Sequence, residues 1–223
     1  MEVSCRKPER ESAQRLYEQI GSHLLRDDAP SNYLDLVSRQ PEFRQYPFTM
    51  LLKLQATGQS PIHHPEGTVW NHTMLVVDEA AKRKSQSRDA SAFMWAALLH
   101  DIGKPLTTRC RNGKITAYRH DTVGEKLTED FLSALTADRS LIEKVSALVR
   151  FHMHILYVTH NLPFADIGEM KRRTDLREVG LLGLCDRMGR GGASQAEEAA
   201  QTAFFIRQCE QSQLETHIGG DPG

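Results

Sequence analysis

Residues 96–105 read "AALLHDIGKP", an apolar helical run that ends in two ionisable side chains, His100 and Asp101. Gly103 and Pro105 follow at once, and both residue types are typical of the end of a helix. Because a cation near a helix C-terminus also suits the helix dipole, the pair alone has no necessary chemical role. Such a role requires that other segments of the chain supply partners for the pair.

The composition narrows the class of protein. The chain has 223 residues, and its 28 Lys and Arg against 29 Asp and Glu give a formal net charge of −1. This length allows one large domain with a sizeable core, and the charge gives no general case for a basic nucleic-acid-binding surface. The four cysteines are scattered, without the spacing of a zinc or disulfide site. No stretch predicts a signal peptide or a membrane span, so we expect a soluble cytoplasmic protein.

Helical periodicity dominates the chain and predicts an all-α fold. The expected helices lie near residues 11–27, 31–40, 46–57, 69–84, 89–101, 123–135, 138–154, 166–188 and 195–211. Thr122 and Glu125 match a capping box and predict the start of the helix over 123–135. The one predicted β element is a hairpin within 107–118, because Asn112-Gly113 favours a tight turn.

The domain organisation follows from this pattern, since the sequence has no internal repeat and no sharp break in composition. We predict an N-terminal helical appendage over residues 1–44, a main helical domain over 45–212 and a flexible tail over 213–223. The fold class is therefore a helical bundle with a small β-hairpin and extra N- and C-terminal helices.

Several ligand-type side chains share a helix face with apolar residues, and positions three, four and seven apart lie on one face. His100 follows Phe93 and Ala97, and His152 continues the stripe of Val145 and Leu148. Asp186 extends Val179 and Leu182, His72 shares its face with Leu75 and Val76, and His120 lies at a helix start. A single inward histidine is more often an ordinary core residue, and a buried aspartate is usually paired with a cation.

Inward ligand-type residues from several separate helices have one common explanation, which is a metal centre. Imidazole nitrogens and carboxylate oxygens are suitable ligands for Zn, Fe, Mn, Co or Ni, and the lack of cysteine ligands disfavours a structural zinc site. Since adjacent helical residues diverge by about 100°, His100 and Asp101 share a metal only by straddling it at the helix end. We therefore expect the helix to stop where the metal binds.

The order of these residues resembles that of the HD-domain superfamily of metal-dependent phosphohydrolases, whose core signature is "HDIG". A closer similarity, over residues 45–195, is to the HD domain of bacterial CCA-adding tRNA nucleotidyltransferases. It is carried by "HHPEGTVWNHTM", "AALLHDIGKP", "RHDTVGEK", "VRFHM" and "CDRMGRGG". Those enzymes also carry a polymerase head with a pair of metal-binding aspartates. Because no Asp-x-Asp occurs here, we expect a stand-alone HD hydrolase that acts on phosphomonoesters or cyclic phosphodiesters.

The resemblance implies one or two divalent metal ions, from Fe, Mn, Ni, Co, Zn and Mg, and a role for each candidate residue. Asp101 and Lys104 are the predicted catalytic residues, and Lys104, Arg187 and Arg190 are predicted to contact the phosphate because all three flank ligand residues in the sequence. One metal would be held by His72, His100, Asp101 and Asp186, and His120 with His152 would complete a second site bridged by Asp101. For each of the three cations the alternative is an ordinary surface charge. His64 and Glu66 either approach the mouth of the site or cap the helix that begins near Val69.

Two other functions fit the same residues. Some HD proteins with this ligand pattern bind two irons and resemble oxygenases, and a nucleotide-sensing or RNA-contacting module would keep the fold without the chemistry. We expect a nucleotide-like phosphate ester as the substrate. RNA is not indicated by the charge, and no membrane partner is expected.

Overall fold

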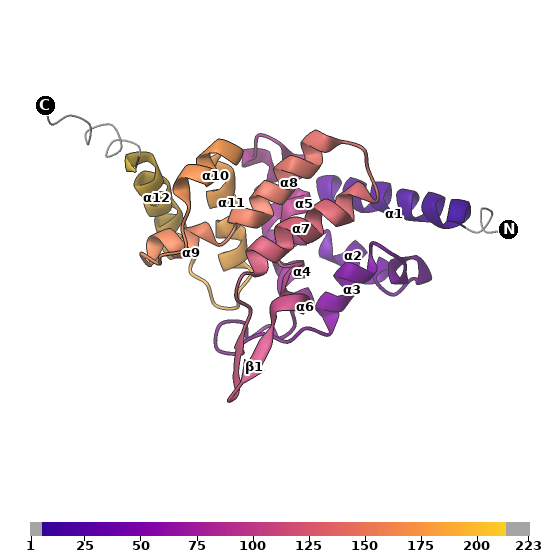
Figure 1. Ribbon diagram of the computed structural model, residues 1–223, viewed down its shortest axis with the longest axis horizontal. Helices are drawn as coiled ribbons and strands as arrows, with labels where there is room; N and C mark the ends of the chain where they lie inside the picture. Colours follow the sequence, from indigo (N-terminus) through magenta and orange to yellow (C-terminus); the bar gives the residue numbers. More distant parts are fainter. Residues whose placement is uncertain (1–5, 213–223) are drawn as a thin grey trace, which may run out of the picture.

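The core of the protein is built around the apolar helix α5 (Ala90–Leu99), as Figure 1 shows for the computed structural model, which describes residues 6–212. Every residue from Ala92 to Leu99 is buried. The helices that pack against α5 are α1 (Arg6–Arg26), α4 (Val69–Ala81), α8 (Arg139–Phe151) and α11 (Leu176–Met188). A helix that is apolar on all sides needs this complete cover, which explains its central place.

The remaining helices lie outside this inner group and confirm the all-α prediction. They are α2 (Ser31–Val37), α3 (Thr49–Gln55), α6 (Lys104–Thr107), α7 (His120–Ser133), α9 (His154–Thr159), α10 (Ile167–Arg173) and α12 (Gln195–Gln211), with the short 3₁₀ helices η1 (Pro41–Arg44) and η2 (Lys84–Gln86). Helix α7 packs along α8, and α12 packs on α11 and α9. Within residues 6–212 no helix is long and apolar enough to cross a membrane.

The predicted hairpin is present and projects from the helical body at the bottom of Figure 1. Strands β1 (Arg109–Arg111) and β2 (Lys114–Thr116) are antiparallel, with Arg111 opposite Lys114. Asn112 and Gly113 have φ values of 50° and 74°. A two-residue turn of this kind requires positive φ at both positions, which is why the Asn-Gly pair identified it from the sequence.

Two predictions about helix ends were wrong. Helix α7 begins at His120, so Thr122 lies inside it, and Arg119 precedes it in the left-handed conformation with φ of 61°. The single helix predicted over 166–188 is two helices, because the carboxylate of Asp175 accepts a hydrogen bond from the backbone N–H of Arg177 and starts α11 there. Aspartate is a strong N-cap residue, and it interrupts the helical pattern at this point.

The N-terminal helix α1 contributes to the same core as the rest of the bundle. Leu16, Ile20 and Leu24 are buried, and Tyr17 stacks on Trp95 of α5 with ring centroids 4.9 Å apart. The predicted domain boundary at residue 44 stays a prediction. These contacts show that α1 packs on the core, but not whether either part folds on its own. The predicted tail over 213–223 lies outside the described residues.

Candidate metal centre

The six predicted ligands come together at one place in the helical core. His72 lies on α4 and Asp186 on α11, while His120 is the first residue of α7. His100 and His152 directly follow α5 and α8, and Asp101 comes after His100. All six are buried, with exposed fractions of 7% or less. Six ionisable or polar side chains in a helical core require partners, since an unpaired buried polar group is costly.

Three of the histidines are held by the same backbone contact. The Nδ1 atoms of His100, His120 and His152 lie 2.8, 2.7 and 2.6 Å from the carbonyl oxygens of residues 97, 117 and 149. A carbonyl oxygen only accepts, so each Nδ1 donates its proton and each Nε2 carries a free lone pair. All three Nε2 atoms lie near Asp101. This is the arrangement in which an outer hydrogen bond fixes the tautomer of a metal-binding histidine.

The carboxylate of Asp101 lies between two groups of histidines. Its Oδ2 atom is 3.2 Å from Nε2 of His100 and 4.0 Å from Nε2 of His72. Its Oδ1 atom is 3.4 Å from Nε2 of His120 and 3.9 Å from Nε2 of His152. Each oxygen thus faces its own pair of nitrogens, which is the geometry required of a carboxylate that bridges two ions.

These donors fit a divalent metal on their own geometry. The Nε2 atoms of His120 and His152 lie 3.1 Å apart, and both carry lone pairs once their Nδ1 atoms donate to the backbone. Facing lone pairs repel unless a proton or a cation lies between them, and 3.1 Å suits two ligands of one ion with bonds of about 2.1 Å. The buried Nε2 atom of His100 makes no hydrogen bond to any described residue.

Glu66 is a member of the site whose role the sequence did not settle. Its Oε1 atom lies 2.8 Å from Nδ1 of His72 and 2.9 Å from Nδ1 of His64. The helix is instead capped by Thr68, whose hydroxyl accepts a hydrogen bond from the backbone N–H of Asn71. Glu66 therefore orients His72 toward Asp186, whose Oδ1 atom lies 2.9 Å from Nε2 of His72. The sequence signal was a carboxylate six residues before a histidine, which is common and carries little information.

Most of the charges in the centre favour its metal-binding form, and His72 is the exception, because burial is outweighed by hydrogen bonds with Asp186 and Glu66, which raise its pKa. Burial alone would raise the pKa of Asp101, but Lys104 and His100 outweigh it and hold this pKa well below its usual value. Burial also opposes the ionisation of Asp186, and Arg190 outweighs it in the same way. Burial, together with His120 and His100, lowers the pKa of His152 to about 3. Ionised carboxylates and neutral imidazoles are the protonation states that bind a metal.

The three predicted phosphate contacts lie in different surroundings. The Nζ atom of Lys104 is 2.7 Å from Oδ2 of Asp101, so this cation is part of the centre. Arg190 lies 3.2 Å from Oδ2 of Asp186, and its buried Nε has no hydrogen-bond partner among the described residues. Arg187 pairs with Glu198 of α12, so a role at the phosphate would require that pair to separate.

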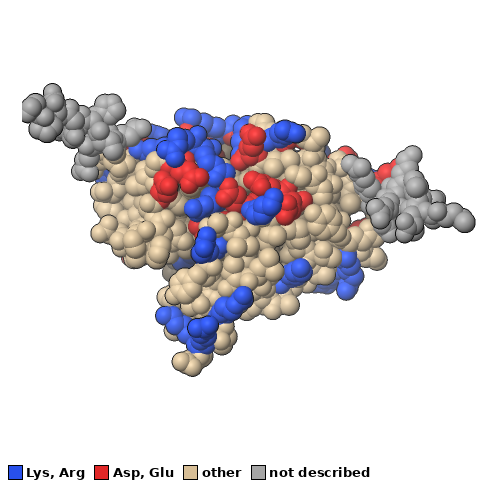
Figure 2. Space-filling model, in the orientation of Figure 1, with Lys and Arg blue, Asp and Glu red and all other residues tan. Residues whose placement is uncertain are grey.

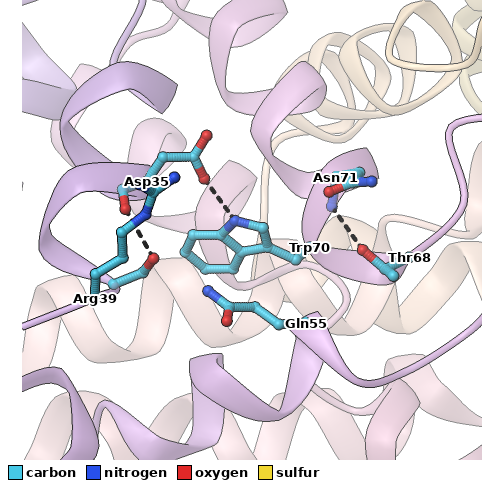
Figure 3. A pocket seen from close by; sticks show the side chains of 7 residues that line it. Asp35, Arg39, Gln55, Thr68, Trp70 and Asn71 are labelled. Carbon is cyan, nitrogen blue, oxygen red and sulfur yellow. Dashed lines mark hydrogen bonds between the residues drawn. The ribbon is translucent and has the colours of Figure 1, made fainter.

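A surface pocket near the start of α4 is separate from the six candidate ligands. Figure 3 shows Trp70 inside it, where the indole N–H donates to Oδ1 of Asp35 at 2.7 Å. The pocket also has side chains from α2 and α3, and none of the six ligand candidates lines it. The pocket therefore lies between the N-terminal helices and α4, apart from the candidate metal centre.

Comparisons with known proteins identify the family to which the chain belongs. The family model described as "HD domain" matches residues 62–191, which is more than half of the chain. The chain is 31% identical over 172 residues to the Multifunctional CCA protein of Methylococcus capsulatus, covering 74% of this chain and 39% of that protein. It is 31% identical over 150 residues to the A-adding tRNA nucleotidyltransferase of Deinococcus radiodurans, covering 64% and 32%.

A further relative is the Multifunctional CCA protein of Actinobacillus pleuropneumoniae, which is 28% identical over 102 residues that cover 46% of this chain and 24% of that protein. The chain thus spans between a quarter and two fifths of the length of these relatives. With the family match over most of its core, the chain belongs to the HD domain family.

Proposed function

We propose that the protein is a metal-dependent phosphohydrolase that acts on a nucleotide, a cyclic nucleotide or a phosphate at an RNA end. The observation that carries the proposal is the placement of Asp101, whose two oxygens each face two buried histidine nitrogens. Membership of the HD domain family supports the hydrolase class. Relatives that are named for their action on tRNA support a nucleotide-like substrate.

The donors divide into two sets around Asp101. His72, His100 and Asp186 would hold one ion together with the Oδ2 side of the carboxylate. His120 and His152 would hold a second ion on the Oδ1 side. The division follows the distances, because His72 and Asp186 are in direct contact and so are His120 and His152.

Two cations are placed to contact the phosphate ester. Lys104 lies beside Asp101 and is also 2.5 Å from Oε1 of Gln59, so its ammonium group is held at the edge of the centre. Arg190 has a free buried Nε–H while another of its nitrogens contacts Asp186. Arg groups suit phosphate recognition because their donors are arranged in a planar fork. These residues would bind and orient the phosphoryl oxygens as negative charge grows on them.

A divalent ion bound by these ligands supplies Lewis acidity and lowers the pKa of water toward ~7, so that a hydroxide nucleophile is available at neutral pH. The chain's own residues do the rest. Glu66 and the backbone carbonyls fix the histidine tautomers. The ionised Asp101 is shared by the two sets of ligands and so keeps them at a fixed separation. Lys104 and Arg190 neutralise the substrate's charge and hold its phosphorus near the bridging carboxylate.

The test measures hydrolysis by metal-stripped protein reloaded in turn with Mn, Ni, Co, Zn, Mg and anaerobic Fe(II). The esters are 2′,3′-cyclic AMP, nucleoside monophosphates and bis-p-nitrophenyl phosphate. We expect metal-dependent turnover in the wild type and its loss in Asp101→Asn. The matched control is Asp121→Asn, which changes a buried carboxylate that pairs with Arg150 at 2.9 Å and lies outside the six ligands.

Each alternative function has its own result in this experiment. Two bound irons with oxygen consumption and no phosphate release would favour an oxygenase and contradict the proposal. Tight nucleotide binding without turnover in any metal would favour a binding module. Unchanged turnover in Asp101→Asn would show that the site lies elsewhere.

A further inference from the structure

The charge of the protein is balanced overall but uneven along the chain. Between Asp101 and Asp121 the sequence has five Lys and Arg residues and no Asp or Glu, whereas the whole chain has 28 against 29. This segment contains α6 and the β1–β2 hairpin. The nearly neutral net charge of the whole chain therefore conceals one locally cationic region. This region begins and ends at the metal centre.

The hairpin gathers three of these cations on one face. Arg109 and Arg111 are two residues apart on β1, so their side chains lie on the same face. Lys114 lies directly opposite Arg111 and shares that face. Like charges directly opposite one another destabilise a two-stranded pair. The arrangement weakens the hairpin by itself, which points to an anionic partner outside the chain.

No acidic side chain within the described residues compensates these charges. Arg109, Arg111 and Lys114 are all exposed and have no ion pair with any residue in the described part of the chain. The guanidinium of Arg109 donates only to nearby backbone carbonyls, those of Leu106 and Thr108. Figure 2 shows basic side chains over the hairpin and no acidic ones beside them on the face in view. Their charge is therefore available to an outside anion.

The cationic hairpin joins Lys104 to His120, the most exposed of the six candidate ligands. Lys104, which is 9% exposed, starts α6 before the hairpin, and His120, which is 7% exposed, starts α7 after it. The ligands His72, His100 and His152 are exposed by 1% or less. The base of the hairpin thus lies beside the most exposed of the candidate ligands, and a strand bound to the hairpin would approach the centre from this side. A buried centre of this kind admits a chain end or a small molecule and excludes the middle of a duplex.

An aromatic ring and a fourth cation lie between the hairpin and His120. Tyr118 is 75% exposed, which is unusual for so large a ring, and it offers a face on which a base can stack. Arg119 has φ of 61°, a conformation that glycine adopts without steric cost and arginine does not. An arginine kept in that conformation adds a further exposed charge at the entrance.

We propose that the β1–β2 hairpin is a docking surface for a single-stranded nucleic acid, whose terminal phosphate it brings to the metal centre. Arg109, Arg111 and Lys114 bind successive backbone phosphates, and Tyr118 stacks on a base near the end. The role of the docked strand as a substrate rests on the proposed function, whereas its binding does not. Because a mononucleotide cannot reach these additional contacts, the end of a polynucleotide is the preferred substrate.

The test compares two triple variants that remove the same charge. The hairpin variant is Arg109→Gln with Arg111→Gln and Lys114→Gln, and the control is Arg172→Gln with Arg177→Gln and Arg207→Gln, three exposed arginines on α10, α11 and α12. Binding of a fluorescein-labelled oligouridine of 12 nucleotides is followed by anisotropy from 50 to 300 mM salt. Circular dichroism checks that each variant is folded.

We expect the hairpin variant to bind at least about tenfold more weakly at low salt, with a slope of log affinity against log salt reduced by about 2, since each phosphate contact contributes about 0.7. Tyr118→Ala is expected to weaken binding about tenfold without changing the slope. A poly-glutamate peptide of equal charge is expected not to compete. In the hairpin variant, the ratio of turnover on a 3′-phosphorylated oligouridine to turnover on a mononucleotide falls.

Equal losses in both triple variants, full competition by poly-glutamate, or no binding by the wild type would overturn the proposed surface. Hydrolysis of bis-p-nitrophenyl phosphate by the wild type separates the two proposals. Hairpin-dependent binding without any ester hydrolysis would keep the surface and contradict the phosphohydrolase. Ester hydrolysis without hairpin-dependent binding would support the phosphohydrolase and contradict the docking surface.

Discussion

Gly103 and His120 are in backbone contact, so close that a Cβ added at Gly103 would lie 2.1 Å from the carbonyl oxygen of His120. The same Cβ would lie 2.8 Å from the backbone nitrogen of Gly124. Gly103 has φ of −77°, a conformation open to any residue, so the glycine is required for space and not for a turn. This contact brings Asp101 and His120 to the 3.4 Å separation seen in the centre.

Gly103→Ala is expected to destabilise the protein by about 3 kcal/mol, because backbone atoms cannot yield as a flexible side chain does. It should also weaken metal binding, since it moves His120 away from Asp101. Guanidinium denaturation and metal titration measure the two effects. The control is Gly168→Ala in α10, where the nearest atom is 3.5 Å away at the end of the Arg172 side chain. That variant should be neutral or stabilised by up to about 1 kcal/mol.

His152 and His154 are both buried at the α8–α9 junction, but only His152 faces Asp101. Nε2 of His154 instead accepts a hydrogen bond from the backbone N–H of Asp166. We expect His152→Gln to lose one bound metal and His154→Gln to retain the wild-type number. Metal content measured after dialysis, alongside a thermal melt for each variant, checks this. Equal metal loss in both variants would contradict the proposed second set of ligands.

Glu66 is a positioning residue for His72, since its contact with Nδ1 fixes the direction of the imidazole. Glu66→Gln should lower metal affinity about 10- to 100-fold, as expected for the outer partner of a ligating histidine. Isothermal titration with the preferred metal measures the change. Glu79→Gln, which breaks ion pairs of a partly buried carboxylate with Lys82 and Arg83, is the control and should leave the affinity unaltered.

The ion pair between Asp89 and Lys144 predicts a pH-dependent contribution to stability. The hydrogen bond from Lys144, 2.8 Å away, is the largest cause that lowers the pKa of Asp89 in the folded state. A carboxylate with a depressed pKa stabilises the fold above its unfolded pKa of about 3.9, and this contribution is lost as the pH falls through the folded value. Because the pair is exposed, we expect Asp89→Asn to cost about 0.5–1 kcal/mol at pH 7.

That cost should shrink as the pH falls below about 4, where the wild-type carboxylate also becomes neutral. Urea denaturation of both proteins at pH 7, 5, 4 and 3 provides the comparison. The double variant with Lys144→Gln should be no less stable than Asp89→Asn alone at pH 7. A cost that is constant with pH would assign the effect to the helix cap and not to the charge.

The sequence predicts the fold well where a local pattern determines the structure. The apolar run of α5, the amphipathic stripe of α8 and the Asn-Gly turn each correspond to one physical preference. Predictions failed at helix ends. Thr122 and Glu125 match a capping box, yet the side chain of Glu125 pairs with Arg173 of α10. A tertiary contact of this kind is invisible to a local rule.

The candidate site divides in the same way. The histidines that meet at Asp101 could be identified from the sequence, because they share a helix face with apolar residues or lie at a helix start. Helical periodicity gives no information about loops, and Glu66 lies in a loop, so its contact with His72 was not predicted. Leu75 was expected to face the core beside His72 but is 43% exposed, because it lies on an exposed stripe of α4 with Asn71, four residues earlier. The local excess of cations in the hairpin was hidden by a whole-chain charge of −1.

The contact between Gly103 and His120 has an evolutionary consequence for the segment between them. Its two ends are held together by the core, so the β1–β2 hairpin within it is free to change in length and sequence without moving the candidate ligands. Descendants of one ancestral centre can therefore acquire different substrates through insertions and exchanges in this one segment. Grafting hairpins from distant family members onto this scaffold would be a direct route to altered selectivity.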